Sequence, residues 1–180
     1  CTSAAAGSPC ALSSQVKYDG PLIAAATPAP SSTAVPELLG NPSKARYPND
    51  NDSDEYARNP WDMQVFNGRI YIGSGNSANT GPRQNAGPVD LWYYDLTSGV
   101  FAKDAISGAN CGTDCVDEEQ IDKFKLIDST LYIPGHDPRN NSAGDFYRIE
   151  GSAWKAYHNT PLDLHGYDVY KYQSKLFLSG

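Results

Sequence analysis

The sequence lacks long hydrophobic runs and is poor in basic side chains. The longest apolar candidate, residues 22–26, is far shorter than the roughly 18 residues that a membrane-spanning helix needs, so we expect no transmembrane segment. Lys and Arg number 14 in the 180 residues, against 21 Asp and Glu, and the formal net charge is −7. Such a negative balance disfavours nucleic acid and anionic lipid headgroups as partners.

Cysteine and histidine are also scarce, with four and three residues. No second ligand pair stands at zinc-finger spacing beside Cys111 and Cys115, and the histidines are scattered, so the sequence disfavours a zinc site. The two cysteines enclose only Gly-Thr-Asp, and a loop this short can close a disulfide in an oxidising compartment. We expect that disulfide, with two free thiols as the alternative.

The first residue is Cys1 rather than methionine. This start resembles a bacterial lipoprotein after signal removal, and the small polar residues 2–8 suit a flexible tether. The resemblance implies an acyl chain on Cys1 and, because the next residue is not Asp, a place in the outer membrane at the cell surface. Alternatively, Cys1 marks the cut of an excerpted chain or pairs with Cys10. If Cys1 carries lipid, we expect the partner of Cys10 beyond residue 180.

The first 40 residues contain three charged side chains and one aromatic among many Ala, Ser and Pro. Such a segment cannot bury enough apolar surface to fold alone, and its prolines favour extended geometry. We therefore predict a low-complexity tether or stalk over residues 1–55, which could also lie along the domain that follows, and a folded domain over residues 56–180.

Three segments of that domain repeat one pattern of strand, two-residue turn and strand. The segments are residues 63–72, 124–133 and 169–178. Asn67-Gly68 is the strongest hairpin signal because both residues accept positive φ, and Asp128-Ser129 and Gln173-Ser174 occupy the same place in the other repeats. Each second strand is apolar on both faces, which is typical of a sheet packed between two neighbours, as in a propeller blade.

A second strand pair follows each of the first two hairpins, so that four strands make a unit. Tyr71, Tyr132 and Phe177 mark the repeat at spacings of 61 and then 45 residues, and propeller blades span about 40 to 50. The first unit is longer because of insertions at residues 74–88 and 104–119. We predict an all-β fold of four-stranded antiparallel blades at about 61–104, 121–158 and, incomplete, 165–180.

The blades resemble those of kelch-type propellers over residues 61–180. The resemblance rests on Tyr94-Asp95 followed by Phe101, and on Tyr147-Arg148 followed by Trp154 at the same spacing. The sequence departs from the kelch pattern in lacking its adjacent glycine pair and in having Arg148 and Phe101 in place of Asp and Trp. About two and a half blades cannot close a ring, which needs about four to eight, so we expect further sequence or other chains to complete it.

Four titratable side chains lie where the chain enters the predicted innermost strands. They are Asp62, Asp122, His165 and Asp168. His165 with Asp168 could form an oriented imidazole for acid–base chemistry, but acids at such positions more often cap backbone amides. No nucleophile stands at a motif spacing and no sialidase-type Ser-x-Asp-x-Gly-x-Thr-Trp box occurs, so the sequence favours a protein that is not an enzyme.

Calcium is the one cofactor that the sequence allows. Asp50, Asp52 and Asp54 stand at alternate positions, as oxygen ligands around calcium do, although the glycine turn of an EF-hand is missing. A solvated acidic linker is the alternative. Residues 75–88 form a long polar segment that could be a loop contacting a glycan or a partner protein, with a disordered segment as the alternative. Its candidate contact residues are Asn76, Asn79, Arg83 and Gln84.

Export, tether and repeated blades agree with a surface-anchored propeller that acts as a binding or assembly module for protein or glycan. Two alternatives stay open. One is an extracellular enzyme that degrades polysaccharide or glycoconjugate with the four titratable side chains above. The other is a structural subunit of a surface assembly, in which neighbouring copies complete each other's blades.

Overall fold

The computed structural model of the chain describes residues 36–47, 58–76, 87–138, 144–158 and 165–180. The chain divides into two compact units, residues 1–38 and 39–180, and every described strand belongs to the second. The predicted boundary near residue 55 lies outside the described residues. A 3-10 helix, η1 (Pro42–Ala45), precedes the strands. The predicted all-β class is confirmed, and no helix in the described ranges is long and apolar enough to span a membrane.

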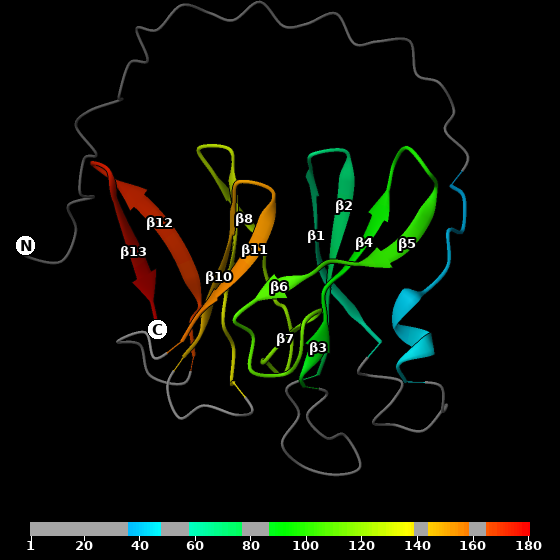
Figure 1. Ribbon diagram of the computed structural model, residues 1–180, viewed down its shortest axis with the longest axis horizontal. Coiled ribbons are helices and arrows are strands. Elements are labelled where there is room, and N and C mark those ends of the chain that lie inside the picture. Colours follow the sequence, from blue (N-terminus) through cyan, green and yellow to red (C-terminus); the bar gives the residue numbers. More distant parts are fainter. Residues whose placement is uncertain (1–35, 48–57, 77–86, 139–143, 159–164) are drawn as a thin grey trace, which may run out of the picture. The chain divides into compact units, whose positions relative to one another are not determined.

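The first sheet contains four antiparallel strands in the order β1-β2-β4-β5 (Figure 1). Its strands are β1 (Pro60–Phe66), β2 (Arg69–Ser74), β4 (Trp92–Asp95) and β5 (Val100–Lys103). This order follows the chain, as expected for one four-stranded unit. The sheet is open at both edges.

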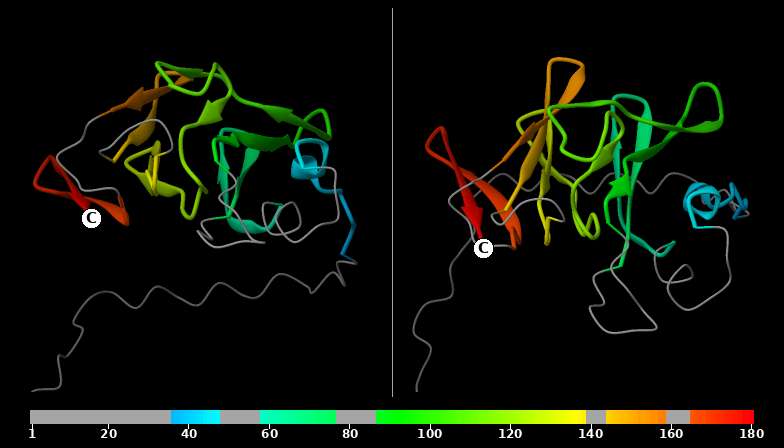
Figure 2. Two further views of the ribbon diagram at one scale, coloured as in Figure 1. Left: turned by 90° about the horizontal axis from the view of Figure 1, so that it is seen from below. Right: turned by 60° about the horizontal axis from the view of Figure 1, so that its bottom comes forward.

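The second sheet has the order β6-β11-β10-β9-β8, in which β6 is the short strand Ile106–Ser107. Its antiparallel strands are β8 (Lys125–Ile127), β9 (Thr130–Pro134), β10 (Phe146–Glu150) and β11 (Ala153–Tyr157). A terminal hairpin of β12 (Asp168–Tyr172) and β13 (Lys175–Ser179) follows. The two views in Figure 2 show the first sheet, the second sheet and the terminal hairpin as successive separate elements.

The three predicted hairpin turns are confirmed. Both residues of each turn have positive φ, namely Asn67 (48°) and Gly68 (74°), Asp128 (46°) and Ser129 (63°), and Gln173 (46°) and Ser174 (65°). Turns with two positive φ values match the right-handed twist of the flanking strands, which explains why these short sequences place the hairpins correctly.

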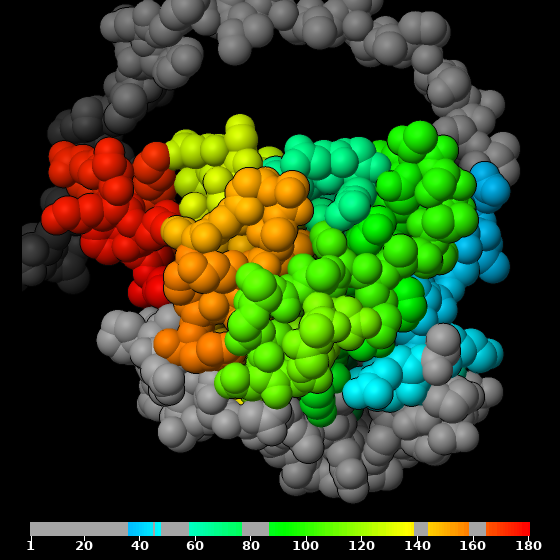
Figure 3. Space-filling view, in the orientation of Figure 1, coloured from blue at the N-terminus to red at the C-terminus, as the bar shows by residue number. Residues whose placement is uncertain are grey.

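The predicted insertion over residues 104–119 adds one strand to the second sheet and one to a separate two-stranded sheet. Strand β6 (Ile106–Ser107) pairs in parallel with β11, and the two lie side by side on the surface in Figure 3. Strand β7 (Cys115–Val116) pairs with β3 (Val89–Asp90). The predicted disulfide between Cys111 and Cys115 is present, with Cα atoms 6.1 Å apart.

Each sheet packs on the next through one aromatic face. Tyr71 of the first sheet contacts Trp154 of the second edge to face, with ring centroids 5.6 Å apart, and lies in one core cluster with Leu131 and Ile133. Tyr132, on the opposite face of the second sheet, forms a second cluster with Val169 of the terminal hairpin. The second sheet is therefore buried on both faces, as its doubly apolar strands predict.

Candidate functional site

Two of the four titratable candidates, Asp62 and Asp168, make contacts that connect neighbouring sheets. The carboxylate of Asp62 accepts hydrogen bonds from the backbone N–H groups of Phe124 (2.7 Å) and of Met63 (2.8 Å). Its Phe124 contact joins the first sheet to the segment that enters the second. This contact matches the capping role that the sequence offered as the alternative to chemistry.

Asp168 connects the terminal hairpin to the second sheet through two lysines. Its carboxylate lies 3.1 Å from Lys123 Nζ and 3.3 Å from Lys125 Nζ. Burial alone would raise the pKa of Asp168, but hydrogen bonds from Tyr170, the backbone of Val169 and the two lysines hold that pKa well below its usual value. Asp168 is thus a charged anchor for the hairpin, and its contacts are separate from those of His165.

The other two candidates, His165 and Asp122, lie around a second histidine. His136, Asp137 and His165, here called the histidine cluster, each offer a ligand atom within 4.8 Å of the others. His165 Nε2 is 2.6 Å from Asp137 Oδ1, and the two imidazole rings are 5.0 Å apart between centroids. Asp122 Oδ2 lies 3.2 Å from His136 Nδ1.

The backbone after β9 positions the histidine cluster. His136 and His165 face each other across an isolated antiparallel bridge, and the N–H of Gly166 donates to the carbonyl of Gly135 at 2.6 Å. Asp137 adopts a φ of 55°, which turns the chain directly after the bridge. The sequence predicts His165 as a candidate but gives no reason to select His136 or Asp137, because the two halves of the cluster are far apart in the sequence.

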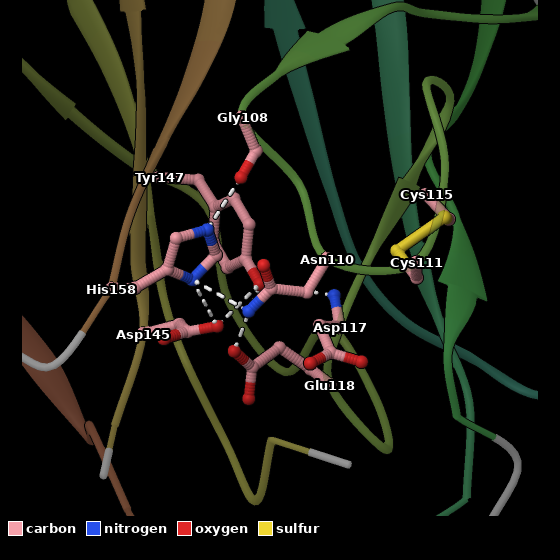
Figure 4. Close-up of polar contacts among 9 residues, drawn as sticks. All are labelled: Gly108, Asn110, Cys111, Cys115, Asp117, Glu118, Asp145, Tyr147 and His158. Carbon is pink, nitrogen blue, oxygen red and sulfur yellow. Dashed lines mark hydrogen bonds and ion pairs between the residues drawn. A yellow bond between two sulfur atoms is a disulfide. The ribbon is translucent and has the colours of Figure 1, made fainter. Parts of the chain in front are cut away.

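Figure 4 shows a buried polar network, which adjoins the histidine cluster because the N–H of Glu119 donates to the carbonyl of His136. Asp117 and Glu118 follow β7, Asp145 precedes β10, and all three side chains are fully buried. Tyr147 links them. Its hydroxyl accepts from the N–H of Asp117 (3.0 Å) and lies within donor range of Glu118 Oε1 (3.1 Å) and Asp145 Oδ2 (3.4 Å).

Glu118 is protonated at neutral pH in this network. Burial, and then the negative charge of Asp145, raise the pKa of Glu118 to about 8, against hydrogen bonds from Tyr147 and from the backbone of His136 that lower it. The network therefore holds a neutral carboxylic acid next to a buried carboxylate. Sequence reasoning missed it, although three consecutive acids at residues 117–119 beside a predicted disulfide are a signal that could have found it.

His158 neutralises the buried carboxylate. Its Nδ1 lies 2.8 Å from Asp145 Oδ2, and its Nε2 contacts the carbonyl of Gly108. Burial lowers the pKa of His158, but the Gly108 carbonyl and Asp145 outweigh burial and raise it overall. Because both ring nitrogens face acceptors, the imidazolium form satisfies both at once. Asp145 and His158 thus form a structural ion pair.

Several sequence predictions concern residues that the structure does not describe. Outside the described residues lie Cys1 and Cys10, the calcium candidates Asp50, Asp52 and Asp54, and the loop residues Asn79, Arg83 and Gln84. Asn76, the first residue of the predicted contact loop, is described and is 6% exposed. Its N–H donates to the carbonyl of Glu119 at 3.1 Å, so Asn76 belongs to the interior.

Comparisons of the chain with protein-family models, with curated proteins and with solved structures found no match. The kelch-type and lipoprotein resemblances therefore stay predictions.

Proposed function

We propose that this chain is a binding and assembly module built of propeller blades, whose two end faces bind the matching faces of further copies of the chain. In this proposal the first and second sheets are blades and the terminal hairpin begins a third. One observation carries the proposal: the sheets pack on one another in a repeated manner, and both ends of the succession leave the corresponding apolar face exposed.

The outer face of the first sheet carries the exposed Met63 and Val65 and the half-buried Ile70 and Ile72, here called the isoleucine face. Met63 pairs with Ile72 and Val65 with Ile70 across β1 and β2, so the four side chains share one side of the sheet, opposite Tyr71. Met63 is 64% exposed and Val65 is 56% exposed. The equivalent face of the second sheet, with Leu131 and Ile133, is buried against the first sheet.

The exposed face of the terminal hairpin consists of Tyr170, Tyr172 and Phe177, here called the aromatic face. Tyr170 pairs with Phe177, which places both opposite Val169 and its partner Leu178. Phe177 is 49% exposed, whereas its sequence equivalents Tyr71 and Tyr132 are buried against a following sheet. The aromatic face therefore presents the side chains that elsewhere in this chain contact the next sheet.

The two end faces have the chemistry of the two sides of the internal interface. Between the first and second sheets, the face with Tyr71 packs against the aliphatic face with Leu131 and Ile133. By the same pattern, the aromatic face of one copy can pack against the isoleucine face of another. Such a contact is heterologous, and repeated head to tail it produces a ring or a filament. Exposed apolar surface on both faces supplies the driving force.

An exported location is part of the proposal. The disulfide between Cys111 and Cys115 supports an oxidising compartment outside the cytoplasm. Acylation of Cys1 would add anchoring at the membrane surface and would concentrate copies of the chain in one plane. An intact-mass measurement on the natural protein tests this anchor by the added mass of acyl chains.

Sedimentation velocity across a range of protein concentrations tests the assembly. We expect the full chain to associate as its concentration rises. Replacing Met63 and Val65 with lysine should keep the chain monomeric, and so should Phe177→Lys, because each change places a charge in one of the two apolar faces that every head-to-tail contact needs. The matched control is Leu96→Lys, since Leu96 is 51% exposed but lies in the turn between β4 and β5.

Mixing the two defective variants distinguishes a specific contact between the two faces from nonspecific association. The M63K/V65K variant keeps an intact aromatic face, and the F177K variant keeps an intact isoleucine face. A head-to-tail contact predicts that the mixture forms one heterodimer and no larger species. A wild-type chain that stays monomeric at every concentration, or an equal effect of Leu96→Lys, would refute the proposal.

A further inference from the structure

The histidine cluster has the donor atoms of a transition-metal site. Two imidazoles and one carboxylate lie with their ligand atoms within 4.8 Å of one another. Imidazole is a good ligand for zinc and for other first-row divalent metals, whereas calcium and magnesium prefer sites made of oxygen atoms. Three protein ligands with a further open position are typical of an exchangeable or catalytic zinc site.

A second observation points to a cation at the same place. Buried polar atoms nearly always have a hydrogen-bond partner. Among the proposed ligands, the buried Asp137 Oδ1 lacks one within the described ranges. Asp137 Oδ1 lies only 2.6 Å from His165 Nε2, yet no aligned N–H joins the two atoms. A bound cation would satisfy lone pairs that the protein groups leave unused.

The ligands are held in place by backbone and by a supporting carboxylate. The bridge between His136 and His165 sets the spacing of the two imidazoles, and the turn at Asp137 brings its carboxylate beside them. Asp122, 3.2 Å from His136 Nδ1, is positioned to orient that ring, as carboxylates next to metal-binding histidines commonly do. All three ligands are partly exposed, so an ion and water can reach them.

We infer that His136, Asp137 and His165 bind one divalent transition-metal ion of the zinc class, with Asp122 as a positioning residue. The site is independent of the end faces in the proposed assembly. Metal binding and self-association can therefore succeed or fail separately.

The three histidines of the chain provide an internal control. The full chain, labelled with 15N, stripped of metal and with its free thiols alkylated, is titrated with Zn2+ in excess Mg2+ while the imidazole nitrogens are followed by NMR. We expect saturable 1:1 binding that shifts the signals of His136 and His165. His158, which is engaged by Asp145 and Gly108, should not shift. Equal shifts at all three histidines, or no shift at any, would overturn the inference.

Variants separate ligation from folding. His165→Ala should abolish saturable binding, and Asp137→Asn, which keeps the side-chain shape, should weaken it. Asp122→Asn should weaken zinc affinity about 10- to 100-fold, the usual loss for a supporting carboxylate. Asp62→Asn is the matched control, because Asp62 is a carboxylate tied to Phe124 and lies outside the cluster. Unchanged affinity in both Asp137→Asn and Asp122→Asn, with native circular dichroism, would refute the site.

Discussion

Replacement of Glu118 by glutamine should remove a large pH dependence from the stability of this fold. Glu118 has an ordinary pKa of 4.5, and burial raises the pKa to about 8 in the folded chain. Below pH 4.5 the side chain is protonated in both the folded and the unfolded state. Between pH 4.5 and 8 only the unfolded chain releases the proton, so the free energy of unfolding falls as pH rises.

The magnitude follows from the two pKa values. Each pH unit in this window costs ~1.4 kcal/mol, which amounts to about 5 kcal/mol between pH 4.5 and 8 and to about 3 kcal/mol by pH 7. A glutamine at position 118 is neutral throughout and can still accept from Tyr147 and from the N–H of His136. The stability of Glu118→Gln relative to wild type should therefore rise by about 3 kcal/mol between pH 4.5 and 7.

Other titratable groups next to Glu118 also affect how the free energy of unfolding depends on pH. Asp117, Asp145 and Tyr147 surround it, and His158 reaches it through Asp145. The raised pKa of His158 also makes stability fall as pH rises through that pKa, but this contribution is present in both proteins. The difference between variant and wild type therefore isolates Glu118. A pH-independent cost of the amide would shift the whole curve and leave its slope unchanged.

Urea unfolding at several pH values between 4.5 and 7, followed by tryptophan fluorescence with the disulfide intact, measures this difference. Glu37→Gln is the matched control because Glu37 is exposed. A stability difference that stays constant over the whole range would mean that Glu118 is ionised in the folded chain, and would refute the description of the network.

Three further substitutions test how the sheets and the buried network pack. Gly135→Ala should destabilise the fold by about 1–3 kcal/mol, because a Cβ there would collide with the carbonyl of Asp145 and lie 2.6 Å from Glu118 Oε1. Thermal unfolding measures this loss, and an unchanged melting temperature would contradict it. Trp154→Ala should lower the free energy of unfolding in urea by about 3–5 kcal/mol, since Trp154 is buried against Tyr71. Phe177→Ala, in the exposed aromatic face, should lower it much less. Equal losses would show that the two faces are wrongly assigned.

The local elements of the fold could be read from consecutive residues. Asn67-Gly68 and its two equivalents set the hairpins because a two-residue turn depends on the φ values that those residues accept. Alternating side chains around Tyr71 and Tyr132 identified strands with two apolar faces, and the second sheet is indeed covered on both sides. The short spacing of Cys111 and Cys115 likewise made their disulfide predictable.

The pairing of strands and the contacts between sheets depend on residues that are distant in the sequence. Residues 104–119 looked like an insertion, but they supply β6 to the second sheet and a strand to the β3–β7 pair, because short strands gain their hydrogen bonds from partners distant in the sequence. Asp62 and Asp168 connect neighbouring sheets, since Asp62 accepts from the N–H of Phe124 and Asp168 pairs with Lys123 and Lys125, all of which are distant in the sequence.

The candidate sites show the same division. The sequence by itself identified His165 and Asp122 as titratable groups near strand ends, and its scattered histidines argued against zinc. Only the tertiary structure placed His136 opposite His165 and buried Glu118 beside Asp145. Local conformation depends on neighbouring residues and is therefore visible in the sequence, whereas ligand geometry and the pKa of a buried acid depend on which distant groups surround it after folding.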